Sequence, residues 1–227
     1  MFGYQPSRKP FLDSRFTAKT IQNADGRVRA ENGEYTGKAG RRAIFEARSL
    51  REHLKKSMNI KLAERDLKTK FGDFREILYY DGQTESIAIV MGNVENESDV
   101  LCRIHSNCIT AHVFNSVECD CREQMEMSQA IIQKAEKGVI IYLDQEGKGN
   151  GHLALMASIP HKKAGMKQSE AYKKVGFEAD ARSFRPAAEI LSDLKVESVV
   201  LLTDNVGKAE DLRKWSIVVS ATKEIKI

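Results

Sequence analysis

Three cysteines lie close together in this sequence, at a spacing that suits a metal ion. Ten residues separate Cys108 from Cys119, and Cys121 follows two positions later. All four cysteines of the chain fall within residues 102–121, so we expect no disulfide framework distributed over the 227 residues. Three thiolates can bind zinc and leave the fourth tetrahedral position for water, as in catalytic zinc sites. We therefore predict a zinc site at these three residues.

A cysteine can also be an ordinary small apolar residue of the core. Cys102 fits that role, because it lies in the apolar run Val100–Cys102. The other three cysteines have polar neighbours, among them Ser106, Thr110 and Asp120. These neighbours argue against a position in the core for the three.

A glycine-rich loop, Gln145–Gly151, follows an apolar run and precedes a helical pattern. Backbone amides in such a loop could contact phosphates or the edge of a nucleotide. The spacing before Lys148 is not that of a P-loop, and no Ser or Thr follows the lysine. Three glycines after a strand are often only a tight turn, so the loop alone does not identify a ligand.

Asp180 and Arg182 form an Asp-x-Arg pair shortly after Gly176-Phe177. In most soluble proteins such a pair is exposed and adds little stability. The pair alone does not indicate a function.

The hydrophobic pattern predicts the elements that position these residues. Alternating apolar residues predict an antiparallel sheet of three strands, at 74–80, 86–91 and 99–105. Continuous apolar runs predict buried strands at 139–143 and 198–202. Helical spacing predicts helices at 121–137, with Gly138 as the C-cap, and at 151–165, 169–175 and 186–194. We therefore predict an α+β fold with a mixed sheet at its core.

The N-terminal third differs in charge from the rest of the chain. Residues 1–70 carry 17 Lys and Arg against 8 Asp and Glu, whereas the remainder carries 19 against 24. Residues 1–37 show little periodicity, and the apolar residues of 38–58 recur at helical spacing, which predicts an amphipathic helix. We predict a basic N-terminal arm and helix over residues 1–70, and a second domain over 71–227.

The composition narrows the class of protein. With 41% hydrophobic residues, a chain of this length can bury a core. No apolar run approaches a membrane span, and the first ten residues lack the apolar stretch of a signal peptide. The basic arm lacks the motifs of nucleic-acid-binding modules, so we expect no nucleic-acid partner. We expect a cytoplasmic protein, because thiols stay reduced there.

Four motifs occur in a fixed order along the chain. They are RxHSxCxT and SxxCDC between Arg103 and Cys121, YLDQEGKG at 142–149, GFEADAR at 176–182 and LLTDN at 201–205. Together they resemble the GTP cyclohydrolase II family, zinc enzymes that open the guanine ring in riboflavin synthesis. The resemblance covers about residues 72–220, and the motifs align without a gap between Glu146 and Asp180.

The resemblance implies a role for each matched position. One Zn²⁺ per chain would be bound by Cys108, Cys119 and Cys121. Asp180 would be the proton acceptor, and Arg182 the nucleophile towards the nucleotide phosphate. Because a guanidinium stays protonated, we expect Arg182 at least to clamp that phosphate. The implied nucleotide-binding residues are Arg103, His105, Gln124, Glu146, Lys148, Gln168, Thr203 and Lys208. The resemblance also implies Mg²⁺ with the nucleotide phosphates and a homodimer.

Other matched positions depart from the family pattern, mostly where the base should lie. The residues of this chain, each with the family's residue in brackets, are Lys148 (Arg), Asn107 (Glu), Ala111-His112 (Gly-Asp), Arg122 (Gly), Asn150 (an apolar residue), Gln168 (Thr) and Ile159 (Tyr). Isoleucine can neither donate nor accept a hydrogen bond, so the step assisted by the Tyr must be skipped or supplied elsewhere. The remaining histidines, His112 among them, have no matched role, and we expect them at the surface.

Three hypotheses about function remain open from the sequence. The first is a zinc-dependent cyclohydrolase that opens GTP, releases formate and pyrophosphate, and yields the diamino-ribosylamino-pyrimidinone phosphate or its formylated form. The second is a paralogue that opens the ring of another nucleotide, for example a uracil nucleotide. The third is a nucleotide-binding relative that has lost turnover, which Lys148 and Ile159 favour and the three cysteines oppose.

Overall fold

The structure, a computed structural model, describes residues 21–22, 28–29 and 59–225. The chain divides into two compact units, Met1–Lys56 and Ser57–Ile227. In the first unit, β1 (Ile21–Gln22) pairs with β2 (Val28–Arg29) in antiparallel orientation. The amphipathic helix predicted at 38–58 lies outside the described residues, as does most of the predicted arm.

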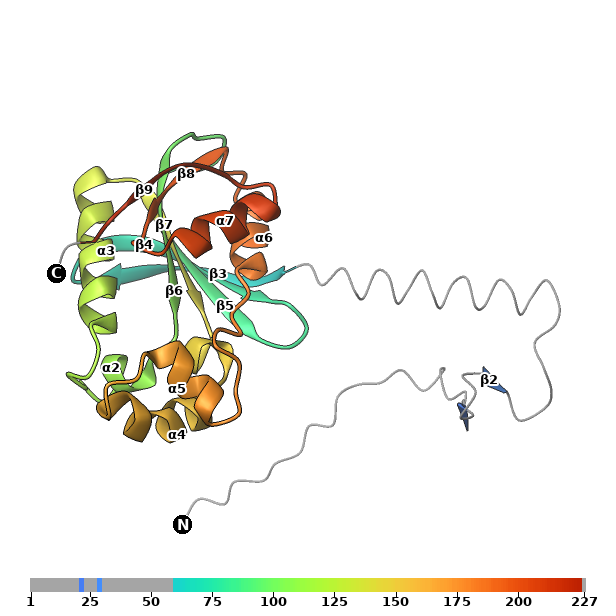
Figure 1. The fold of residues 1–227 in the computed structure, drawn as a ribbon. Helices are drawn as coiled ribbons and strands as arrows, with labels where there is room; N and C mark the ends of the chain where they lie inside the picture. Colours follow the sequence, from blue (N-terminus) through green and yellow to red (C-terminus); the bar gives the residue numbers. More distant parts are fainter. Residues whose placement is uncertain (1–20, 23–27, 30–58, 226–227) are drawn as a thin grey trace, which may run out of the picture. The chain divides into compact units, whose positions relative to one another are not determined.

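The second unit is built on a mixed sheet of seven strands (Figure 1). The strands are β3 (Ile60–Thr69), β4 (Gly72–Tyr80), β5 (Glu85–Met91), β6 (Val100–Ser106), β7 (Gly138–Leu143), β8 (Ser198–Leu202) and β9 (Val218–Lys223). Their order across the sheet is β3-β4-β5-β7-β6-β8-β9. The strands from β3 to β7 in this order are antiparallel, whereas β7, β6, β8 and β9 are parallel. The predicted α+β class is confirmed.

Helices cover both faces of this sheet and extend beyond one of its ends (Figure 1). They are α2 (Ile109–His112), α3 (Cys121–Ala135), the 3-10 turn η1 (Glu146–Gly149), α4 (His152–Lys163), α5 (Gln168–Lys174), α6 (Arg185–Asp193) and α7 (Val206–Lys214). Buried residues of α6 and α7, such as Ile190 and Leu212, pack on one face. Ile132 of α3 packs on the other face, with Ile140 and Leu202. The sheet is therefore covered on both faces, as parallel strands require.

The prediction of an antiparallel strand at 99–105 is wrong in its orientation. β6 lies parallel to both of its neighbours, β7 and β8. Helix α3 lies in the connection from β6 to β7, and a crossover of this kind joins parallel strands. Five of the seven residues of β6 are buried, so both of its faces are covered. Short apolar runs do not reveal orientation, which depends on the connection that follows.

The predicted glycine cap of α3 is also wrong. The helix ends at Ala135, and Glu136 takes the left-handed conformation at its C-terminus, with φ of 56°. Gly138 begins β7 instead. A Cβ atom at Gly138 would lie 2.8 Å from Cγ1 of Ile132 and 2.8 Å from the carbonyl oxygen of Leu101. Glycine is needed there because strand and helix approach each other closely.

The sheet begins earlier than the predicted boundary between residues 70 and 71. β3 forms a register of paired residues with β4 from Ile60 to Thr69, so it belongs to the second unit. Its side chains are mostly exposed, and the apolar alternation that marks a half-buried strand is weak there. In the part of the chain that the structure describes, no helix is long and apolar enough to cross a membrane.

Candidate functional site

Several of the predicted site residues follow the carboxyl ends of three parallel strands, β6, β7 and β8. Cys108 follows the end of β6, Glu146 follows the end of β7, and Thr203 comes directly after β8. The carboxyl ends of parallel strands lie at one edge of a sheet, where open α/β sheets commonly bind their ligands. Helices α2, α4 and α5 lie beyond this edge (Figure 1).

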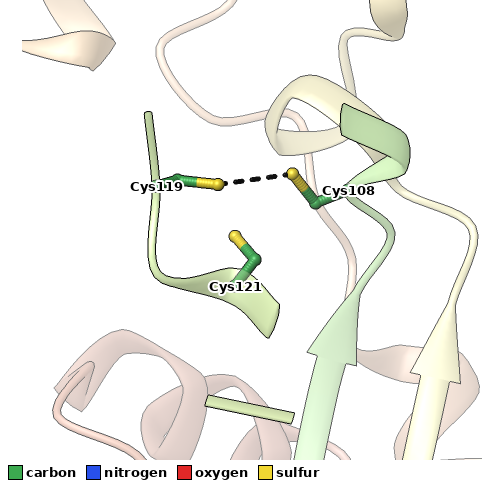
Figure 2. Close-up of side chains that lie close together, drawn as sticks. All are labelled: Cys108, Cys119 and Cys121. Atoms are coloured by element: carbon green, nitrogen blue, oxygen red, sulfur yellow. Dashed lines mark hydrogen bonds between the residues drawn. The ribbon is translucent and has the colours of Figure 1, made fainter. Parts of the chain in front are cut away.

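The three cysteines come together from separate segments. Cys108 precedes α2, Cys121 is the first residue of α3, and Cys119 lies in the loop between them. Their Sγ atoms all lie within 4.8 Å of one another, and those of Cys108 and Cys119 are 3.6 Å apart. Figure 2 shows the three side chains pointing toward a common centre. Cys108 is buried, and the other two are half-buried.

This donor set fits a zinc ion. Tetrahedral thiolates at the usual Zn–S distance of about 2.3 Å are spaced about 3.8 Å apart, close to the observed Cys108–Cys119 separation. Burial raises the pKa of Cys121, and the neighbouring charge of Cys108 raises it further. Burial also raises the pKa of Cys119. Three thiolates this close repel one another, and a bound divalent cation would offset both the repulsion and the burial.

His105 lies beside His112, a residue expected at the surface from the sequence. The Nε2 atoms of His105 and His112 are 3.2 Å apart, and the centres of the two rings are 5.0 Å apart. The Nδ1 atom of each ring is buried and has no hydrogen-bond partner among the described residues. Burial, followed by the charge of Arg103, lowers the pKa of His105, so its imidazole is neutral. The expectation of a surface role is therefore wrong for His112.

No sequence signal would have identified His112. It approaches His105 only because the chain turns back after β6 and enters α2, a helix of four residues. Arg122 helps to hold that helix, since its Nε atom donates to the carbonyl oxygen of Ala111 at 2.9 Å. Its Nη2 atom donates to the carbonyl oxygen of His112 at 2.8 Å. A glycine at position 122 could make neither contact.

A second group of predicted residues surrounds the ends of β6 and β8. Arg103 is buried, and its guanidinium donates to the carbonyl oxygen of Leu202 at 2.9 Å and to Oε1 of Gln124 at 2.5 Å. Thr203, also buried, accepts a hydrogen bond on Oγ1 from the backbone of Asn205. The structure therefore brings Arg103 and Gln124 into contact, although 21 positions separate them.

Lys208 extends from α7 into the same region. Its Nζ atom donates to the carbonyl oxygen of Ile104 at 3.0 Å, and the residue is only 7% exposed. Burial, followed by the positive charges of Arg103 and Arg182, lowers the pKa of Lys208 to about 7. Within the described residues, no carboxylate forms a salt bridge with this ammonium. Lys208 is therefore suited to receive an anion from outside the protein.

The loop after β7 carries Glu146 and Lys148. Glu146 is buried, and its Oε2 atom accepts a hydrogen bond from the backbone nitrogen of Ile109, next to Cys108. Lys148 has a left-handed conformation, with φ of 55°. A Cβ atom at Gly149 would lie 2.8 Å from the carbonyl carbon of Ala181, so glycine permits close approach of the segment that carries Asp180 and Arg182.

Asp180 and Arg182 form a bidentate ion pair. Nε of Arg182 donates to Oδ1 of Asp180 at 2.9 Å, and Nη2 donates to Oδ2 at 2.6 Å. Burial raises the pKa of Asp180, but the hydrogen bonds and charge of Arg182 outweigh burial, and the net shift is downward. The guanidinium of Arg182 and the ammonium of Lys208 lie 5.4 and 5.7 Å from the ring centre of Phe184. Two candidate phosphate-binding cations therefore flank one aromatic ring.

Asn150 joins the loop after β7 to the segment before Asp180. Its Nδ2 atom donates to the carbonyl oxygen of Glu178 at 2.9 Å, and its Oδ1 atom accepts from the backbone nitrogen of Glu178 at 3.2 Å. Gln145 adds a hydrogen bond to the carbonyl oxygen of Ser183 at 2.6 Å. An apolar residue at position 150 would leave these backbone groups of Glu178 without this partner.

Two positions singled out in the sequence lie away from these contacts. Gln168 begins α5, and its Nε2 atom donates to Oγ of Ser158 on α4 at 2.9 Å. No described contact joins it to the other predicted nucleotide-binding residues. Ile159 is half-buried on α4, seven positions after His152, which places both on the same side of the helix.

The chain matches a known family over most of its length. The family described as GTP cyclohydrolase II matches residues 60–224. A riboflavin biosynthesis protein RibBA from Endomicrobium trichonymphae is 37% identical over 164 residues, which cover 71% of this chain and 41% of that protein. A GTP cyclohydrolase-2 from Archaeoglobus fulgidus is 40% identical over 176 residues, which cover 76% of this chain and 46% of that protein. The chain spans less than half the length of these two relatives.

A third relative is closer in length. A GTP cyclohydrolase-2 from Histophilus somni is 38% identical over 158 residues, which cover 69% of this chain and 73% of that protein. Among solved structures, a two-domain 3,4-dihydroxy-2-butanone 4-phosphate synthase from A. baumannii shows 16% identity, with a TM-score of 0.40 over 91% of this chain and 52% of that chain. That structural likeness is too weak to bear on fold or function.

Proposed function

The chain belongs to the GTP cyclohydrolase II family, and on this premise we propose that it is a zinc-dependent cyclohydrolase that opens the guanine ring of GTP. Formate and pyrophosphate would be released, and the product would be the diamino-ribosylamino-pyrimidinone phosphate of riboflavin synthesis or its formylated form. One observation carries the proposal. Three Sγ atoms lie within 4.8 Å of one another at the strand edge that also bears Glu146 and Lys208.

Cys108, Cys119 and Cys121 would hold the zinc ion. When bound there, zinc would supply the Lewis acidity that makes water a nucleophile near neutral pH, so that C8 of guanine can be attacked. Glu146 lies next to this centre, because its carboxylate accepts the backbone hydrogen bond of Ile109. Its other oxygen remains to accept a hydrogen bond from the substrate.

The buried cations would bind the phosphates, which would enter with Mg²⁺. Among the described residues, the hydrogen-bond partner of Lys208 is a backbone carbonyl oxygen alone, and a phosphate oxygen beside it would favour its charged form. Arg182 would clamp a phosphate and stabilise the charge that develops as pyrophosphate departs. Arg103 is held by Gln124 and Leu202, so it would contribute a fixed positive charge.

Asp180 would accept a proton during ring opening. Its lowered pKa keeps the carboxylate ionised at neutral pH, and Arg182 fixes its orientation through two hydrogen bonds. The same ion pair links the proton acceptor to the phosphate clamp. Binding of phosphate to Arg182 would weaken the pair and make Asp180 a stronger base.

The second candidate function is the opening of another nucleotide's ring. The departures from the family pattern in the binding pocket favour it, among them Ile159, since isoleucine cannot supply the hydroxyl of the tyrosine that the family pattern has there. We further propose a homodimer, which rests on the family resemblance, and a cytoplasmic location, which rests on the need to keep the three thiols reduced.

A nucleotide panel tests the proposal. Purified zinc-loaded protein is incubated with Mg²⁺ and GTP, ATP, UTP or CTP, and the products are identified by mass. Formate and pyrophosphate should appear only with GTP. Cys119→Ser should lose both zinc and turnover, whereas Cys102→Ser, at a cysteine outside the cluster, should keep its zinc. GTP recovered unchanged while another nucleotide is consumed would assign the protein to the second function.

A further inference from the structure

A pocket of about 630 Å³ opens beside the cysteine cluster, and its lining includes three polar side chains that the proposed reaction leaves partly unused. They are Asn107, Asp144 and Glu146. Asn107 directly precedes Cys108, and Asp144 directly follows β7. Ile109 and Phe114 supply apolar lining. The pocket therefore combines apolar surface with a few directed polar groups, as ligand pockets do.

Hydrogen bonds fix the orientation of the Asn107 amide. The hydroxyl of Tyr142 donates to Oδ1 of Asn107 at 2.5 Å, and Nδ2 of Asn107 donates to Oδ1 of Asp144 at 3.0 Å. The backbone nitrogen of Asn107 is also bound, to the carbonyl oxygen of Leu143 at 2.8 Å. The amide cannot turn over without losing both side-chain contacts.

The groups left for a ligand follow from this arrangement. Nδ2 of Asn107 retains one N–H, and Oδ2 of Asp144 has no described partner and is a free acceptor. The pocket thus presents one donor beside one anionic acceptor. Asp144 is exposed and takes part in none of the salt bridges of the described residues, so its carboxylate is available to a ligand.

We propose that Asn107 and Asp144 read the base of the bound nucleotide and select guanine. This inference rests on the proposed function only in that the site must take a nucleotide. Guanine carries an acceptor, O6, next to two donors, N1–H and N2–H. The free N–H of Asn107 matches O6, and the carboxylate of Asp144 matches the two donors.

Other bases match this pair less well. Hypoxanthine keeps O6 and N1–H but lacks the N2 amino group. Xanthine has an oxygen in place of that amino group, and this acceptor would face the carboxylate. Adenine has no N1–H, and uracil has a single ring donor on that edge. Of these bases, only guanine offers two adjacent donors to the carboxylate, and a site that loses a hydrogen bond to a charged group discriminates strongly.

Binding and turnover of GTP, ITP and XTP test the inference with Asp144→Asn. An asparagine at position 144 would offer an N–H to the xanthine oxygen and repel the guanine amino group. Affinities are measured by calorimetry at low temperature without Mg²⁺, and formate release is measured separately with Mg²⁺. The matched control is Asp73→Asn, because Asp73 is an exposed residue of β4 and does not line the pocket.

Wild-type protein should bind GTP about 10-fold more tightly than ITP and about 100-fold more tightly than XTP. Asp144→Asn should lose affinity for GTP and gain affinity for XTP, so that XTP becomes the preferred ligand, with zinc content unchanged. Asp73→Asn should behave as wild type. Equal wild-type affinities for the three nucleotides, or an unchanged order in Asp144→Asn, would overturn the inference.

The two readouts keep this inference separate from the proposed function. Guanine-selective binding that switches in Asp144→Asn, without formate release from GTP, would leave the base-reading pair standing and refute the cyclohydrolase. Formate release from GTP with an unchanged binding order in Asp144→Asn would do the reverse.

Discussion

Replacing Lys208 by methionine should stabilise the ligand-free protein, and the gain should depend on pH. Lys208 is almost fully buried, and within the part of the chain that the structure describes its ammonium donates only to a backbone carbonyl oxygen. Burial and the neighbouring arginines lower its pKa from the ordinary 10.5 to about 7. Methionine has a similar length and no charge to bury, so the variant should lose the destabilising effect.

The size of the effect follows from the pKa difference. Each pKa unit corresponds to about 1.4 kcal/mol, so the shift from 10.5 to about 7 destabilises the wild-type protein by up to about 5 kcal/mol below pH 7. Between pH 7 and 10.5 the unfolded chain binds a proton that the native protein does not bind. The free energy of unfolding therefore rises with pH in this window, and the full destabilisation is present below pH 7. Between pH 6 and pH 9 the free energy of unfolding of the wild-type protein should rise by about 3 kcal/mol because of this residue.

Urea unfolding at pH 6 and pH 9 measures this difference. Lys208→Met should be more stable than wild type by up to about 5 kcal/mol at pH 6, and the advantage should shrink by about 3 kcal/mol at pH 9. Lys214→Met is the control, because that side chain lies on the same helix and is 72% exposed. A difference between Lys208→Met and wild type that does not change with pH would show that Lys208 titrates near its ordinary pKa.

Nucleotide binding provides an independent check on the same residue. A triphosphate beside Lys208 should raise its pKa again, so binding at pH 8 should take up about one proton in wild type and none in Lys208→Met. Calorimetry in two buffers of different ionisation enthalpy counts that proton. Equal proton uptake in both proteins would mean that the phosphates lie elsewhere.

Three further substitutions test other parts of the site. Asp180→Asn should reduce formate release about 100-fold or more while zinc content stays unchanged, because the proton acceptor is lost and the thiolates are not; full turnover would remove Asp180 from the reaction. Asn150→Leu removes both hydrogen bonds to Glu178, so it should destabilise the protein by about 1 to 3 kcal/mol and speed amide hydrogen exchange at Ala181; unchanged exchange would contradict this. Ile159→Tyr should shift the product from the formylated to the deformylated pyrimidine, as seen by mass spectrometry, and an unchanged ratio would show that this position does not control the later step.

The sequence was most informative where a feature is local. The spacing of Cys108, Cys119 and Cys121 can be read directly, and the structure brings their sulfur atoms together. The contacts of Arg103 could not be read in this way, because Gln124 and Leu202 reach it from other elements. The parallel orientation of β6 has the same cause, since it depends on the crossover through α3. Residue types identify candidate ligands, but pairings between distant segments depend on topology.

The pocket beside Cys108 was hidden in the sequence for a different reason. Asn107 is a departure from the family pattern, and a substitution alone does not show what replaces the lost group. The structure shows Asn107 held by Tyr142 and bound to Asp144, so three residues that are unremarkable singly form one directed network. A changed residue in a binding site therefore has to be judged together with the neighbours that orient it.

The charges along the strand edge indicate how a nucleotide would lie. The residues that flank Phe184, Arg182 and Lys208, carry positive charge, whereas the pocket beside Cys108 carries Asp144 and Glu146. A nucleotide has the complementary polarity, with an anionic triphosphate at one end and the donor groups of guanine at the other. The reverse orientation would place phosphates against two carboxylates and leave Lys208 without an anion. If the base lies at Asn107 and Asp144, its reacting ring lies next to Cys108, because Cys108 stands between the pocket residues Asn107 and Ile109 in the chain.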